Sequence, residues 1–214
     1  MTINRPYIAY LAALAVTVGI AAGCSSNDSG PEGETNQPSG TADSISSSGA
    51  PHAPQPTLTA PSLQPPPQKQ SNRPAVVYDP CTWIPDDVIA RAGFDPSSRK
   101  RPGDQIAEQT FLICHFDSKP RLLSVLSGNV TWDQDLQKNS AWSEPISVNG
   151  REAMWVRDPG LAAGRGCDLH LRTKVGFVAL GSMVTLSGLS QDMKPCDGLL
   201  DIATAIEPTI GKDN

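Results

Sequence analysis

The sequence predicts an α+β fold, in which helices pack on an antiparallel sheet that two disulfides hold in place. In several stretches apolar residues alternate with polar ones, the period of strands that are buried on one face. Other stretches, including one near the C-terminus, repeat apolar residues at helical spacing. Four cysteines lie among these stretches. Interspersed strands and short helices favour an antiparallel sheet covered by helices.

Turn motifs separate the predicted strands. Ser118-Lys119-Pro120 joins the first two, and Asn149-Gly150, the favoured pair for a type I′ turn, joins the next two. The last two are the longest, turn at Val175-Gly176, and are expected at the centre of the sheet. The expected strands are 110–117, 121–128, 144–148, 151–157, 167–174 and 177–186.

Three helices are predicted from their ends. Residues 85–93 place proline and acids in the first turn and glycine at the stop. Thr131-x-x-Gln134 is typical of a capping box, and it opens a helix to about Asn139. A C-terminal helix is expected to start at Cys196 and to end at Pro208, and its apolar stripe should cover the sheet.

Cys81, Cys114, Cys167 and Cys196 make an even set in a domain expected to be exported, which predicts two disulfides from three possible pairings. A zinc site is not favoured, because no two of them have Cys-x-x-Cys spacing. We favour Cys81 with Cys114 and Cys167 with Cys196, since each pair joins a helix region to a strand in its own half of the domain.

The N-terminus has the pattern of a lipoprotein signal peptide, residues 1–23. Arg5 precedes an apolar region from Tyr7 to Ile20, and the small residues Ala21-Ala22-Gly23 precede Cys24. Cys24 is therefore expected to become the lipid-bearing N-terminus, carrying diacylglycerol and a further acyl chain such as palmitate. An uncleaved transmembrane anchor is the alternative, but Gly and Thr interrupt an apolar part shorter than the ~20 residues of a span.

Residues 24–78 are expected to be the lipidated cysteine and a disordered tether. Residues 25–77 contain ten prolines and no aromatic residue, so they have too little apolar surface to offset the entropy of ordering. The globular domain is expected over 79–214, a length that suits one domain.

Charge argues against a nucleic-acid partner. The net charge is −5, and the only compact basic cluster, Arg99-Lys100-Arg101, is expected in a solvated surface loop. The membrane, reached through the N-terminal lipid, is the expected contact. A protein, glycan or lipid of the cell envelope is the expected partner of the domain.

Four features follow one another along residues 79–210. They are Asp79-Pro80-Cys81 before a short helix that ends at Ala92-Gly93, a Cys114-x-Phe116 strand, the run Val148-Asn149-Gly150-Arg151-Glu152-Ala153, and Cys196 before a C-terminal helix. In this order they resemble an actinobacterial lipoprotein family known only as domain of unknown function 3558. The resemblance implies an envelope lipoprotein with two disulfides and an α/β/α fold of the PsbP type. It implies no catalytic residue.

Catalytic motifs are not found in the sequence, and no cofactor is expected. Ser97-x-x-Lys100 has the spacing of a penicillin-binding nucleophile and base, but the partner motifs are missing and a turn is favoured. His115 with Asp117, and Asp168 with His170, each alternate along one predicted strand, so each pair faces one side of the sheet. Four metal ligands would converge if those two strands were neighbours.

We therefore expect a lipid-anchored protein on the extracytoplasmic side of the cell membrane, acting as a non-enzymatic binding or assembly module. The alternative is an accessory metal-binding protein or hydrolase that uses the His/Asp cluster. A large apolar pocket would favour a small ligand or lipid, and a broad flat apolar patch would favour a protein partner. Convergence of His115 with His170 would favour a metal.

Overall fold

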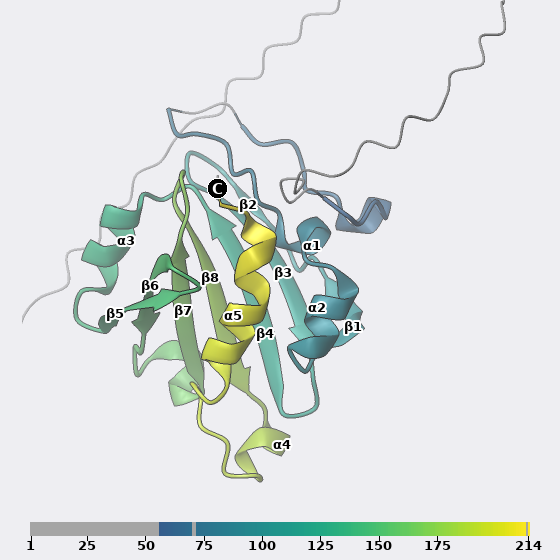
Figure 1. Ribbon diagram of the computed structural model, residues 1–214, viewed down its shortest axis with the longest axis vertical. Coiled ribbons are helices and arrows are strands. Elements are labelled where there is room, and N and C mark those ends of the chain that lie inside the picture. Colours follow the sequence, from purple (N-terminus) through teal and green to yellow (C-terminus); the bar gives the residue numbers. More distant parts are fainter. Residues whose placement is uncertain (1–55, 70–71, 213) are drawn as a thin grey trace, which may run out of the picture. The chain divides into compact units, whose positions relative to one another are not determined.

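The computed structural model describes residues 56–69, 72–212 and 214, and within them the strands form one antiparallel sheet (Figure 1). The order across the sheet is β1-β3-β4-β8-β7-β6-β5, with β2 paired to β3 beside β1. The central strand is β8, as the sequence predicts. The strands are β1 (Asp95–Lys100), β2 (Gln105–Ile106), β3 (Thr110–Asp117), β4 (Arg121–Gly128), β5 (Ser143–Val148), β6 (Arg151–Val156), β7 (Gly166–Arg172) and β8 (Phe177–Val184).

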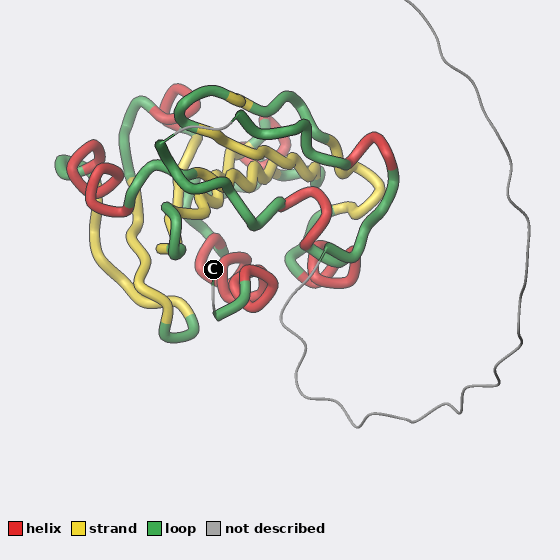
Figure 2. Tube along the Cα trace, turned by 90° about the horizontal axis from the view of Figure 1, so that it is seen from above, coloured by secondary structure: helices red, strands yellow, loops and turns green. Residues whose placement is uncertain are grey.

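Helices lie on both faces of the sheet, which gives three layers. They are α1 (Pro80–Trp83), α2 (Asp86–Arg91), α3 (Trp132–Asn139), α4 (Leu186–Leu189) and α5 (Leu199–Ile210), with 3-10 turns η1 (Pro61–Leu63) and η2 (Leu161–Gly164). Viewed from above, α5 lies on one side of the strands (Figure 2). No helix in the described part of the chain is long and apolar enough to cross a membrane.

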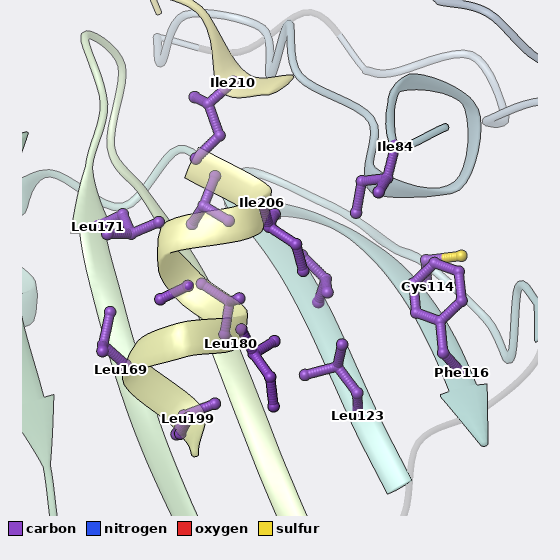
Figure 3. Packing of buried hydrophobic residues seen from close by; sticks show 14 of the residues in the cluster. Ile84, Cys114, Phe116, Leu123, Leu169, Leu171, Leu180, Leu199, Ile206 and Ile210 are labelled. Atoms are coloured by element: carbon purple, nitrogen blue, oxygen red, sulfur yellow. The ribbon is translucent and has the colours of Figure 1, made fainter. Parts of the chain in front are cut away.

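We call the face under α1, α2 and α5 the helix-covered face. Its side chains form the main core, which joins the three helices to strands β3, β4, β6, β7 and β8. Figure 3 shows Leu199, Ile206 and Ile210 of α5 directed at the leucines of the strands. Removal of these apolar side chains from water stabilises the fold, by about 25 cal/mol for each Å² of apolar surface buried.

We call the opposite face the groove face, and α3 packs on it. A second, smaller core joins Trp132 of α3 to Met154, Val156 and Phe177. The predicted capping box explains why α3 starts where it does. The Thr131 side chain accepts a hydrogen bond from the Gln134 backbone N–H, and the Gln134 side chain accepts one from the Thr131 backbone N–H.

Most predicted elements are confirmed. Strands β3 and β4 have the predicted bounds, and β5 and β6 form the predicted hairpin, in which Asn149 and Gly150 both have positive φ, as a type I′ turn requires. The strand expected to reach Leu186 ends at Val184, because Thr185 caps α4 there by accepting from the Gly188 N–H.

The prediction that Pro208 ends the last helix is wrong. Helix α5 starts at Leu199, after Gly198, and continues through Pro208 to Ile210. Proline removes the hydrogen bond that the carbonyl four residues earlier would accept. That carbonyl, on Thr204, accepts instead from the Asn149 side chain at 3.0 Å. A side chain of the β5–β6 turn thus donates to the helix carbonyl that proline leaves without its usual partner.

The predicted surface loop at Arg99-Lys100-Arg101 is also wrong, as is the turn at Ser97-x-x-Lys100, because residues 95–100 form β1. The Arg99 side chain is buried, lies over the Phe116 ring at 4.9 Å, and donates to Asp86 and to two carbonyls of the α1 region. An arginine thus fills the inward position where the alternation pattern requires an apolar residue.

The packed domain begins before Asp79, earlier than we expected. The Thr57 and Leu58 N–H groups donate to the Thr82 carbonyl, and Val76 is buried in the core. Arg101, buried in ion pairs with Asp79 and Asp104, also donates to the Leu63 carbonyl at 2.7 Å. The predicted signal peptide, Cys24 and the first part of the predicted tether lie outside the described residues.

Both predicted disulfides are confirmed. Cys81 of α1 is bonded to Cys114 of β3, and Cys167 of β7 is bonded to Cys196, which lies just before α5. Because Cys114 and Cys167 point to the main core, both bridges tie helices to the helix-covered face.

Candidate functional site

A groove runs across the groove face, with a volume of about 600 Å³. Its floor is the sheet, one wall is α3, and its ends are formed by the β2–β3 turn and by the segment that leads into η2. Side chains of both chemical kinds line it. The lining residues are Gln105, Gln109, Phe111, Ile113, Leu126, Val130, Gln134, Asp135, Lys138, Asn139, Val156, Asp158, Leu161, Asp168, His170, Phe177 and Ala179.

The floor is apolar because three strands present apolar side chains to both faces of the sheet. Phe111 and Ile113 of β3, Leu126 of β4 and Ala179 of β8 point to the groove face and are half-buried. Helix α3 has eight residues, too few to cover all of them. The floor therefore remains accessible from the groove while its edges belong to the second core.

Three ionisable side chains, those of Asp135, Asp168 and His170, meet where α3 packs on β7. His170 of β7 shares a hydrogen bond of 2.6 Å between Nδ1 and Oδ2 of Asp135, which α3 supplies. Its other nitrogen, Nε2, faces Oδ2 of Asp168 at 3.9 Å. The imidazole stacks on the Phe177 ring at 4.9 Å between centroids. His170 is thus fixed between a fully engaged carboxylate and one that remains open to the groove.

The environment of His170 favours its protonated form. Burial lowers the pKa of the imidazole, but the hydrogen bond to Asp135 and the negative charges of Asp135 and Asp168 outweigh burial and raise that pKa above its ordinary value. His115 behaves in the opposite way, because burial and the charge of Lys100 lower its pKa more than Asp117 raises it.

Glycines make room for the side chains of the groove. A Cβ on Gly181 would lie 2.9 Å from Oδ1 of Asp168, and one on Gly128 would lie 2.6 Å from the Phe111 ring. Both distances are shorter than real carbon contacts. The absence of a side chain on β8 and β4 at these positions lets Asp168 and Phe111 lie over the neighbouring strand.

The metal cluster that the sequence left as an alternative does not form. His115 and Asp117 lie on β3 and Asp168 and His170 on β7, and although all four point to the groove face, β4 and β8 lie between the two strands. Three strand spacings of about 4.8 Å separate the pairs, too far for one ion with bonds of ~2 Å. In the described part of the chain, no three His, Cys, Asp or Glu side chains could hold a metal ion.

The alternation pattern indicates Asp168 and His170 as site residues, but it does not indicate Asp135 or the apolar floor. Asp135 lies on α3, and the alternation along a strand does not indicate which helix will pack over that strand. The floor had a signal, since Phe111, Leu112 and Ile113 are consecutive apolar residues, and a strand that is apolar on both sides needs cover or a ligand on both.

Comparison with known protein families finds a match. The family described as protein of unknown function (DUF3558) matches residues 19–209, which include all residues that line the groove. No curated protein and no solved structure matches the chain. Because the match extends over most of its length, the chain belongs to the DUF3558 family.

Proposed function

We propose that this protein is a lipid-anchored binding protein of the cell envelope, which holds a small amphipathic ligand in the groove beside α3 and does not transform it. The observation that carries this proposal is the groove itself, with its apolar floor and its charged wall. The sequence left a protein, a glycan or a lipid as the expected partner. The groove favours a small ligand, because a flat apolar patch would be expected for a protein partner.

The size of the groove supports the proposal. Sites for drug-sized molecules have volumes of roughly 300–1,000 Å³, and about 600 Å³ lies in the middle of that range. Half-buried Phe111, Ile113 and Leu126 would lose their remaining contact with water when a ligand covers them. Each Å² of apolar surface removed from water contributes about 25 cal/mol to binding.

The wall supports binding over hydrolysis. The pairing of His170 with Asp135 resembles the general base and the orienting carboxylate of a hydrolase. A hydrolase of that kind would also need a nucleophilic side chain within hydrogen-bond reach of His170 Nε2. The group that faces this nitrogen is the carboxylate of Asp168. Charged groups placed around an apolar floor are typical of orientation and specificity in a binding site.

The anchor rests on the N-terminal sequence. Small residues precede Cys24 directly after an apolar stretch of signal-peptide length, and two or more acyl chains hold a protein on a membrane stably where one does not. Mass spectrometry of the mature N-terminus tests this part. A lipid mass should be present on Cys24 and be lost in Cys24→Ala, and an unmodified Cys24 in the native chain would contradict the anchor.

Binding is tested with N-phenyl-1-naphthylamine, a neutral apolar probe that fluoresces when it leaves water. The chain from residue 25 onward contains every described residue and needs no detergent. We expect saturable fluorescence with this chain. Ala179→Trp, which places an indole on the groove floor, should weaken binding at least tenfold, because the indole occupies the space of the probe.

Ala90→Trp is the matched control, since Ala90 is exposed on α2, on the opposite side of the sheet. It should leave the affinity unchanged, and circular dichroism should show both variants folded. The proposal fails if the native chain shows no saturable binding, or if Ala179→Trp and Ala90→Trp bind the probe equally.

A further inference from the structure

The charges of the groove are unbalanced, and their arrangement bears on which ligand it holds. Its lining contains three carboxylates, those of Asp135, Asp158 and Asp168, against one lysine, Lys138, and the imidazole of His170. Even with His170 protonated, acidic groups remain in excess. An anionic head group, such as a carboxylate or phosphate, would meet net repulsion there.

The carboxylates differ in how far neighbouring groups engage them. Both oxygens of Asp135 have partners, Oδ1 with Asn139 Nδ2 at 2.8 Å and Oδ2 with His170 at 2.6 Å. Oδ1 of Asp158 accepts from the Gly160 N–H at 2.7 Å. Within the described part of the chain, Asp168 has only the 3.9 Å approach of His170, which is longer than a hydrogen bond.

Asp168 is also placed for access. It is half-buried on β7, and Gly181 on the next strand leaves the space that its side chain occupies. Around it lie the apolar floor and the Phe177 ring against which His170 stacks. The groove therefore combines an apolar surface with the carboxylate of Asp168, neither oxygen of which makes a hydrogen bond within the described part of the chain.

We infer that the ligand is a cationic amphiphile, a drug-sized apolar body with a protonated amine that donates to Asp168 while the body lies on Phe111, Ile113 and Leu126. This inference rests on the proposed function, because it names the ligand class of the same groove. An ammonium group offers three donors and a positive charge, which suits a carboxylate beside a partly desolvated floor.

Three probes with the same ten-carbon chain test the inference, namely decylammonium, decanol and decanoate. Each is titrated below its micellar concentration, at low salt, against N-phenyl-1-naphthylamine bound to the chain from residue 25 onward. We expect decylammonium to displace the fluorophore at about one tenth of the concentration that decanoate needs, with decanol in between. Added salt should weaken only the preference for the amine.

Asp168→Asn keeps the shape of the side chain and removes its charge. It should reduce the preference for decylammonium over decanoate to about threefold or less and leave decanol unchanged. Asp133→Asn is the matched control, because Asp133 is exposed on α3 and does not line the groove. It should leave the full preference in place, which separates binding at Asp168 from general attraction to an acidic protein.

The outcomes distinguish the two proposals. If neither the fluorophore nor decanol binds, the proposed function itself fails. If they bind but decanoate competes as well as decylammonium, the groove is a binding site and the amine inference is overturned. The inference is equally overturned if Asp168→Asn weakens decanol as much as decylammonium, since that result would give Asp168 a purely structural role.

Discussion

The two faces of the sheet use the same strands in different ways. On the helix-covered face, helices α1, α2 and α5 and both disulfides bury most of the inward side chains. On the groove face, helix α3 leaves half-buried apolar residues and charged side chains around a groove of about 600 Å³. Because successive residues of a strand point to opposite sides, one face can provide stability while the other remains open for binding.

Strand β4 shows the difference within one element. Leu123 points to the helix-covered face and is completely buried, whereas Leu126 points to the groove face and is half-buried. The groove face also contains the buried His170–Asp135 pair, whose desolvation its hydrogen bond must offset. If this comparison is correct, changes on the helix-covered face should mainly reduce stability, and changes on the groove face should mainly affect binding.

The largest effect should come from the disulfides. Replacing Cys167 and Cys196 together with alanine should lower the free energy of unfolding by about 3–4 kcal/mol, since the bridge closes a loop with a sequence separation of 29 residues. Replacing Cys81 and Cys114 should cost a similar amount, with a separation of 33. Urea unfolding without reductant measures both. Losses below about 1 kcal/mol would show that packing alone holds the helix-covered face.

A matched pair of leucines should lose unequal amounts of stability, and the larger loss should overlap in size with the loss from removing one disulfide. Leu123→Ala should cost about 2–5 kcal/mol, because it leaves a cavity in a sealed core, and Leu126→Ala should cost roughly half as much or less. In the same preparations, Leu126→Ala should weaken binding of N-phenyl-1-naphthylamine and Leu123→Ala should not. Equal losses of stability, or weaker binding in Leu123→Ala alone, would contradict the division between the faces.

Local chemistry made much of the fold predictable. Clear alternation placed β3 and β4 at their observed bounds, the Thr131 capping box placed the start of α3, and the preference for bridges within each half gave both disulfides. Strand β1 escaped prediction because Arg99 occupies an inward position, where its charge is balanced by Asp86 and its stem lies on Phe116. Such an arrangement depends on partners distant in the sequence, which spacing cannot show.

The site was predictable only in part, for a related reason. Alternation correctly placed Asp168 with His170 on one face, and His115 with Asp117 likewise. Whether the pairs meet depends on strand order, and β4 and β8 separate them. The partner that His170 does have, Asp135, is supplied by a helix, and the face on which that helix packs is decided by tertiary contacts.

The smallest effect concerns pH and the two histidines of the groove face. The pKa of His170 is raised in the folded chain, so its contribution to stability is fully present below the unfolded pKa of about 6.5 and is lost as pH rises through the folded pKa. The pKa of His115 is lowered, so protonation favours the unfolded chain and His115 reduces stability as pH falls below about 6.5.

Urea unfolding from pH 5 to pH 8 separates the two contributions. Relative to the native chain, His170→Asn should lose more stability at pH 5 than at pH 8, because it removes the charged contact with Asp135 and Asp168. His115→Asn should gain relative stability at pH 5, because it removes a group that must be protonated on unfolding. Both differences should be smaller than the loss in Leu123→Ala. The contrast is that His170 is stabilised as an imidazolium beside the groove, whereas His115 is desolvated outside it. If the two variants instead shift the pH profile in the same direction, this contrast is wrong.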